Sequence, residues 1–164
     1  MKSSKVICLF ASFLILFTGY TQGNEEKQST DLIGNPYPEA QAEVKETLTE
    51  IFTAIQERDA ERLLSFHAYG PKFTEFKNSL HRTGSTENEA EERGLVAAIS
   101  GFDYKLNDLK IDVFGEVAKV TFHADFRPTI DGQNHRQVAQ ATLLFVKLEN
   151  VWKIVHEHLS PLTQ

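Results

Sequence analysis

The chain has 164 residues, of which 41% are apolar, and its 17 Lys and Arg against 23 Asp and Glu give a net charge of −6. This length is enough for one domain with a hydrophobic core. The acidic balance speaks against a nucleic-acid-binding protein, because phosphate contacts need a basic face.

Residues 1–23 predict a secretory signal peptide. Lys2 and Lys5 precede an apolar run over residues 6–17, and small or polar residues follow, with residues 21–23 as the expected cleavage site. A run of about a dozen apolar residues is too short to span a bilayer, which disfavours the alternative of a retained N-terminal anchor. Cleavage would leave 15 basic and 23 acidic side chains, no cysteine and no disulfide. We therefore expect an exported protein, periplasmic or secreted, with no membrane contact after cleavage.

Residues 24–38 are polar and include Gly34, Pro36 and Pro38, which predicts a flexible leader to a single domain over residues 39–162. A first helix is predicted from the end of the leader to near Glu57. Its apolar residues recur at helical spacing, namely Val44, Leu48, Ile51, Phe52 and Ile55. Asp59 can cap a second, shorter helix that Gly70-Pro71 would end.

Residues 71–85 fit no regular element. Thr86 and Glu89 have the spacing of a capping box, in which each side chain accepts a backbone N–H that the helix leaves unpaired. This predicts a third helix that continues through Ile99 and is stopped by Gly101.

After Gly101 the apolar pattern becomes strand-like and stays so. It predicts strands over residues 102–113, 117–126 and 138–148, with a bulge near residues 107–108. A fourth strand follows a two-residue hairpin turn at Glu149-Asn150. Helices first and a four-stranded antiparallel meander last indicate an α+β fold.

The hairpin register predicts which side chains face the helices. With Leu148 opposite Val151, Phe145 lies opposite Ile154, Leu143 opposite His156 and Ala141 opposite His158. Alternation then places one set on the inner face: Trp152, Ile154, His156, His158 and Ser160. A preceding hairpin centred on residues 131–132 would place four more residues on the same inner face: Val120, Phe122, Ala124 and Phe126. Since alanines surround the two histidines, we expect a pocket between the sheet and the helices.

The opposite face mixes charged residues, including His123, Asp125, Lys153 and Glu157, with aliphatic ones. A half-apolar sheet face of this kind is often an interface, and we expect a homodimer through it. The alternative is a solvated outer face with scattered aliphatic side chains.

Residues 114–120 (FGEVAKV) and 152–160 (WKIVHEHLS) resemble the SnoaL-like family of the nuclear-transport-factor-2-like superfamily. The last strand is also similar to the association domain of calcium/calmodulin-dependent protein kinase II. The resemblance implies a cystatin-like cone, with the helices packed in the concave face of a curled, mainly antiparallel sheet around a pocket, and a dimer through the outer face. Its members include ketosteroid isomerases, polyketide cyclases and dehydratases. The isomerases use a carboxylate base together with a Tyr and a protonated Asp that donate hydrogen bonds. This set does not map onto the chain, because Tyr104 would face inward but Asp103 and Asp125 outward.

His156 and His158 are the candidate catalytic residues, because two imidazoles on one face can bind an anionic or carbonyl ligand or move a proton near neutral pH. The alternative is a pair of core histidines bonded to neighbouring groups. The predicted ligand-binding set is Tyr104, Trp152, His156, His158, Phe122 and Leu143, although Trp152 and Tyr104 also fit ordinary core positions.

We predict no metal site, since His123 falls on the other face and two histidines need further ligands. Without a glycine-rich phosphate loop, no cofactor is expected either. Three functions follow. The first is binding of a small, largely apolar ligand in the cone. The second is an isomerase, cyclase or dehydratase that uses a pocket histidine as general base, and the third is a dimeric association module with a filled cone.

Overall fold

The computed structural model describes residues 31–162. The predicted signal peptide and residues 24–30 of the predicted leader lie outside these residues. The described end of the leader, residues 31–37, contains a turn in which the Asp31 carboxylate accepts the Gly34 N–H at 2.7 Å. Within residues 31–162, no helix is both long and apolar enough to cross a membrane.

Three helices form in the predicted order: α1 (Pro38–Glu57), α2 (Ala60–Ser65) and α3 (Ser85–Ala98). The predicted apolar stripe of α1 is buried, and the Asp59 carboxylate caps α2 by accepting the Arg62 N–H at 2.9 Å. The predicted cap at Thr86 is wrong. Gly84 is the N-cap of α3, and the Glu87 carboxylate accepts its N–H at 3.2 Å. The helix stops at Ala98, before Gly101, because the backbone is already extended at residue 99.

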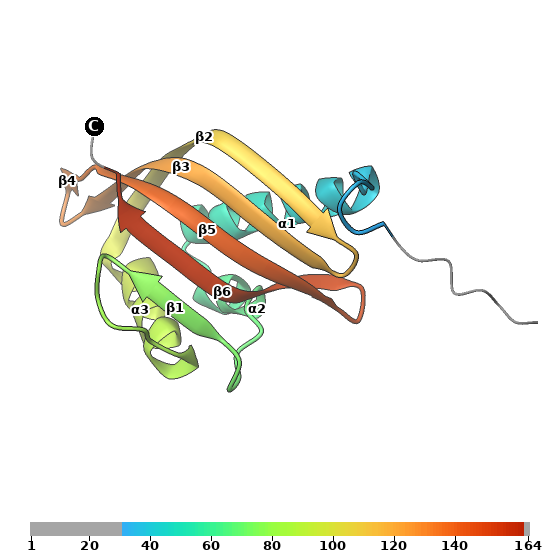
Figure 1. The fold of residues 1–164 in the computed structure, drawn as a ribbon. Helices are drawn as coiled ribbons and strands as arrows, with labels where there is room; N and C mark the ends of the chain where they lie inside the picture. The colour runs from blue at the N-terminus through green and yellow to red at the C-terminus, as the bar shows by residue number, and fades with distance from the viewer. Residues whose placement is uncertain (1–30, 163–164) are drawn as a thin grey trace, which may run out of the picture. The chain divides into compact units, whose positions relative to one another are not determined.

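The strands form one mixed, mostly antiparallel sheet (Figure 1). They are β1 (Thr74–Lys77), β2 (Ile99–Phe114), β3 (Val117–Ile130), β4 (Gln133–Asn134), β5 (Gln137–Leu148) and β6 (Val151–Pro161). Their order is β1-β6-β5-β3-β2, with the short β4 paired to β3. Strand β1 pairs with β6 in parallel and falls within the stretch that fitted no predicted element. The predicted α+β class is confirmed, with one parallel pair added.

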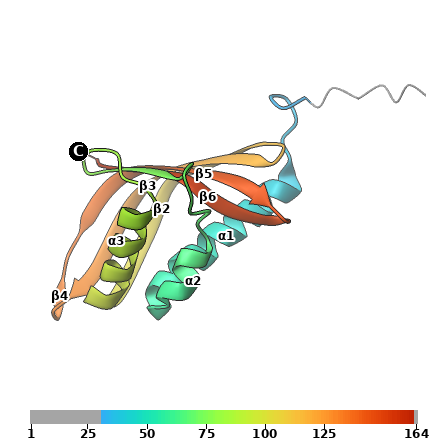
Figure 2. The same ribbon diagram turned by 90° about the horizontal axis from the view of Figure 1, so that it is seen from below.

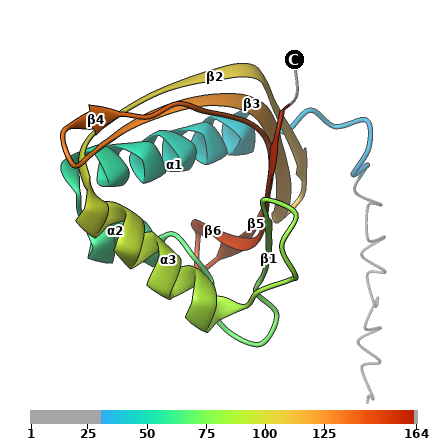
Figure 3. The same cartoon turned by 90° about the vertical axis from the view of Figure 1, so that its left-hand side faces the viewer.

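The helices lie on one side of the sheet (Figure 2). Figure 3 shows the sheet curling around α1, with α2 and α3 closing the open side. The hydrophobic core lies between them, because the inward positions of β3 and β5 are apolar and buried. These positions are Ala118, Val120, Phe122, Ala124, Ala139, Ala141, Leu143 and Phe145. The predicted centring of the β3–β5 hairpin on residues 131–132 is confirmed, and it places Phe122 opposite Ala141.

The β5–β6 hairpin has the predicted turn but not the whole predicted register. Glu149 and Asn150 both have positive φ, 49° and 66°, as a tight two-residue hairpin turn requires. Phe145 lies opposite Ile154 as predicted. The next pair, however, is Leu144 with His156, so Val155 is an extra residue on β6. A bulge of this kind shifts every later residue to the opposite face.

The prediction that His156 and His158 face the helices is therefore wrong. These two side chains lie on the outer face, and Glu157, which was expected there, lies on the inner face with Leu159. The bulge lies where β6 changes its edge partner. Before it, the backbone of Ile154 bonds to residues 66 and 68, and after it β1 begins to pair with His156. The bulge predicted in β2 is confirmed, with Asp108 at φ 51°.

Candidate functional site

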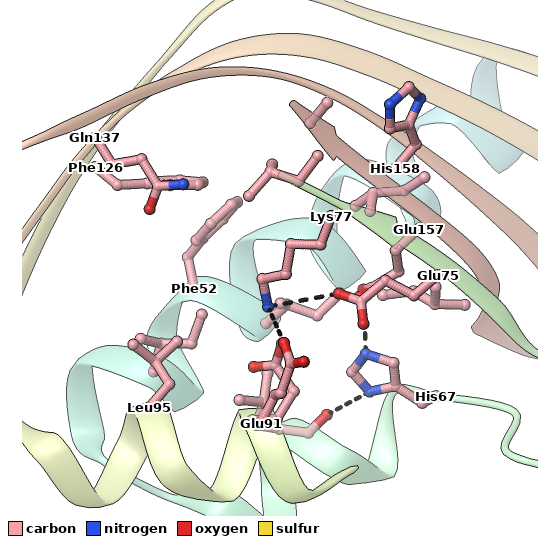
Figure 4. A pocket seen from close by; sticks show the side chains of 18 of the residues that line it. Phe52, His67, Glu75, Lys77, Glu91, Leu95, Phe126, Gln137, Glu157 and His158 are labelled. Atoms are coloured by element: carbon pink, nitrogen blue, oxygen red, sulfur yellow. Dashed lines mark hydrogen bonds and ion pairs between the residues drawn. The ribbon is translucent and has the colours of Figure 1, made fainter. Parts of the chain in front are cut away.

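A cavity of about 360 Å³ lies between the concave face of the sheet and the helices (Figure 4). Phe52 of α1 stands at the centre of its apolar end, stacked on Tyr104 at 4.3 Å and tilted against Phe126 at 5.8 Å between ring centroids. Further apolar lining comes from four elements: Leu95, Phe102, Phe122, Ala141 and Leu143. The close packing of these rings makes this end of the cavity apolar.

The opposite end of the cavity is charged because β1 and β6 run side by side. Their parallel register places Glu75 next to Glu157, with both side chains on the inner face. The same alternation along β1 turns Lys77 inward. Helix α3 adds Glu91 and Glu92 from across the cavity. Four carboxylates therefore line one end of a pocket whose other end is aromatic.

His67, which follows α2, holds Glu157 in place. Its Nε2 lies 3.2 Å from Glu157 Oε1 and its Nδ1 lies 3.2 Å from the Leu63 carbonyl, so both ring nitrogens have partners. The side chain of Asn88 donates to the other Glu157 oxygen at 3.0 Å and accepts from the Tyr69 hydroxyl at 2.6 Å. This chain of bonds ties β6 to α3 and to the loop after α2.

The pair shifts the pKa of both members. Burial opposes protonation of His67, but the hydrogen bond and charge of Glu157 outweigh it and raise the His67 pKa above 6.5. Burial also opposes ionisation of Glu157, yet the hydrogen bond and charge of His67 lower the Glu157 pKa below 4.5. Near pH 6 the two groups form a buried ion pair.

Lys77 is held by two other carboxylates. Its Nζ lies 3.4 Å from Glu75 and 3.1 Å from Glu91. Burial opposes its charge, but the charges of Glu92 and Glu75 outweigh that and raise the Lys77 pKa. Glu75 is only 2% exposed and also accepts the Thr83 hydroxyl at 3.1 Å. Lys77 thus neutralises a buried carboxylate instead of standing free in the cavity.

Glu92 differs from the other three carboxylates. It lines the cavity and is half-buried, and within residues 31–162 no side chain forms a hydrogen bond or ion pair with it. Burial and the negative charge of Glu157 raise its pKa to about 7. A carboxyl group of this kind exchanges its proton near neutral pH, which is what general acid–base chemistry needs.

The structure separates the side chains that the sequence grouped as a site. Phe122 and Leu143 line the cavity. Tyr104 packs behind Phe52, and Trp152 is 2% exposed with its indole N–H donated to Glu43 at 2.9 Å, so both are core residues outside the lining.

The side chains of the two candidate histidines project from the outer face of β6, although His158 is among the residues that line the cavity. His156 Nδ1 is 2.8 Å from the Thr74 hydroxyl on the outer side of the sheet. His158 is exposed, and Figure 4 shows its ring on the opposite side of β6 from Glu157. The groups that do face the cavity, His67, Glu92 and Glu157, were not recognised. The bulge in β6 decides the direction of Glu157, whereas His67 and Glu92 take part only through side chains on other elements. The only available signal was the alternation of residues 74–77 (TEFK), which places Glu75 and Lys77 on one face.

The described residues, 31–162, hold no group of three or more His, Cys, Asp or Glu side chains placed to bind a metal ion. The six charged or titratable side chains at the polar end are instead paired with each other, except Glu92.

Residues 44–164 match the family of the SnoaL-like domain. The chain belongs to this family. The match covers the sheet, α2, α3 and all of α1 except residues 38–43, so the family assignment includes every residue that lines the cavity. None of the curated proteins matches the chain.

Solved structures share this fold at low sequence identity. A proposed dehydratase of the nuclear-transport-factor-2-like family from Streptomyces avermitilis has a TM-score of 0.70 at 20% identity, covering 77% of this chain and 98% of that one. A proposed calcium/calmodulin-dependent protein kinase II association domain from Xanthomonas campestris has a TM-score of 0.63 at 16% identity, covering 74% and 87%. A nuclear-transport-factor-2-like protein with a cystatin-like fold from Novosphingobium aromaticivorans has a TM-score of 0.59 at 18% identity, covering 76% and 82%. These likenesses confirm the predicted cystatin-like fold, and the family match above confirms the predicted SnoaL-like family. At such low identity the solved structures say nothing about the activity of this chain.

Proposed function

We propose that this protein binds a small, largely apolar molecule in the cavity, with one polar group of the ligand at the charged end. The observation that carries the proposal is the cavity itself, about 360 Å³ of space with an aromatic end and a charged end. Ligand sites are typically concave, mostly apolar and supplied with a few polar groups that fix orientation. The cavity also speaks against an association module with a filled cone.

Native mass spectrometry of the protein purified gently from its producing cell tests the proposal. A retained molecule, seen as extra mass that denaturation removes, is the expected result. In the variant Ala141→Phe, a phenyl ring would occupy the space opposite Phe122, and the extra mass should be lost. The matched control is Thr142→Phe, which places the same ring on the outer face of the same strand. Equal loading of both variants would overturn the proposal.

A second candidate function is an enzyme of the isomerase, cyclase or dehydratase type. The specific observation in its favour is Glu92, an unpaired carboxylate with a pKa of about 7 at the edge of an apolar cavity. Of the two possible bases, Glu92 suits the role better than His67, since both ring nitrogens of His67 are already bonded. Turnover by such an enzyme should rise with pH through about 7 and fall by about 100-fold or more in Glu92→Gln.

Export and homodimer formation complete the proposal. Export rests on the sequence of residues 1–23. The dimer rests on the outer face, where Leu144, Val146 and Val155 are half-buried among polar residues. Sedimentation of the purified protein should give twice the subunit mass, and a monomer at micromolar concentration would overturn the dimer.

A further inference from the structure

The charged end of the cavity has more negative than positive groups, and its positive groups are already paired. Glu75, Glu91, Glu92 and Glu157 face Lys77 and His67. Lys77 lies within ion-pair distance of Glu75 and Glu91, and His67 lies within that distance of Glu157. Two negative charges are therefore left over when all four carboxylates are ionised: one is shared by Glu75 and Glu91 around Lys77, and the other lies on Glu92, the only one of the four without a partner within residues 31–162.

Hydrogen-bonding capacity at this end is also one-sided. Above pH 7, where Glu92 is mostly ionised, its carboxylate accepts hydrogen bonds and cannot donate them. The donors nearby are committed: Asn88 donates to Glu157, and the Lys77 ammonium lies between Glu75 and Glu91 (Figure 4). A ligand group entering beside Glu92 therefore meets an acceptor, and must itself donate hydrogen bonds to be held there.

The charge of the ligand follows from the same geometry. A ligand carboxylate would approach four carboxylates with no free cation to offset them, and like charges repel more strongly in a partly enclosed cavity than in bulk water. A ligand cation would complete the set by pairing with Glu92. The aromatic end, with Phe52 and Phe126, suits the hydrocarbon part of the same molecule.

We propose that the ligand is a small apolar amine bound as its ammonium ion, with the nitrogen at Glu92 and the hydrocarbon against Phe52 and Phe126. This inference rests on the proposed binding function and names its ligand class. The cavity defines the site, and the carboxylates decide only the charge of what it accepts. At about 360 Å³ the cavity is near the small end of ligand pockets, which suits a molecule with one aromatic ring or a short chain.

Three probes with one carbon skeleton test the inference: 4-phenylbutylamine, 4-phenylbutanol and 4-phenylbutyrate. Calorimetric titration of the full-length protein at pH 8 should give the tightest binding for the amine, about tenfold tighter than the alcohol, with the carboxylate weaker than both. In Glu92→Gln the amine should lose about tenfold in affinity while the alcohol is unchanged. The control Glu89→Gln removes one charge from the same helix outside the cavity and should leave the amine's affinity within about twofold.

Each other outcome is decisive. Equal affinity for amine and alcohol would overturn the amine while the binding function stands, because a neutral apolar probe would still occupy the cavity. Tightest binding of the carboxylate would overturn it as well, and would show that Lys77 is free to leave Glu91. Binding of none of the three overturns the inference, and the comparison of Ala141→Phe with Thr142→Phe then decides the binding function separately.

Discussion

The two ends of the cavity are built by different means. The aromatic end consists of inward residues on α1, β2 and β3, where regular periodicity alone directs Phe52, Phe122 and Phe126 to one place. The charged end depends on a bulge at Val155 and on the parallel strand β1. Burial of apolar surface stabilises the first end at every pH, whereas the second end is stable only while its charges are paired. The comparison leads to four predictions, given from the largest expected effect to the smallest.

Phe52→Ala should lower the free energy of unfolding by about 4 kcal/mol, because the ring is buried and packs against three other aromatic rings. Chemical denaturation measures this loss, which should be the same at pH 5 and pH 8. The control Glu46→Ala, on the exposed side of the same helix, should change the free energy by less than about 0.5 kcal/mol. A loss that varied strongly with pH would contradict the expectation that the aromatic end is stabilised independently of pH.

Glu157→Ala should lower the free energy of unfolding by about 3 kcal/mol near pH 6, because it leaves His67 and Asn88 without their partner. The effect depends on pH in both directions. The lowered pKa of Glu157 means that the pair's contribution is lost as pH falls below about 4.5, and the raised pKa of His67 means that it is lost as pH rises beyond 6.5. Thermal unfolding of both proteins from pH 3 to 9 should show the largest difference between these limits. An equal difference at every pH would contradict the buried ion pair.

Glu92→Gln should raise the free energy of unfolding by about 2 kcal/mol at pH 8 and leave it unchanged at pH 4. The sign follows from the raised pKa: the folded protein holds a proton on Glu92 that the unfolded chain releases, so stability is lost as pH rises from about 4.5 through about 7. Denaturation at the two pH values measures the gain. Destabilisation by this substitution would mean that Glu92 has a partner in solution that lowers its pKa.

His158→Ala should change the free energy of unfolding by less than about 0.5 kcal/mol and leave ligand retention unchanged, because its ring is exposed on the outer face. Ligand loss in this variant, measured by native mass spectrometry, would contradict the position of the bulge and restore the histidine pocket expected from strict alternation.

Most of the fold could be predicted from local patterns. The stripe on α1, the cap at Asp59, the turn at Glu149-Asn150 and the bulge near Asp108 each depend on residues close in sequence. The register of β3 against β5 followed from one turn at residues 131–132. Strand β1 could not be found in the same way, since four residues carry little periodicity and the partner strand lies about 80 residues away in the chain.

The candidate site was predicted less well than the fold. Phe122 and Leu143 were placed in the cavity because their strands alternate without interruption. The histidines were misplaced because one extra residue at Val155 reverses the faces of everything after it. His67 and Glu92 carried no local signal at all, as their importance arises only from side chains on other elements.

The sequence alone therefore determined the fold class, the SnoaL-like family, the apolar lining and the hairpin, because periodicity and turn chemistry act over a few residues. Only the tertiary structure decided which ionisable groups meet in the cavity. Electrostatic environment depends on distance in space, and the groups that set the pKa of Glu92 come from β1, β6 and the loop after α2.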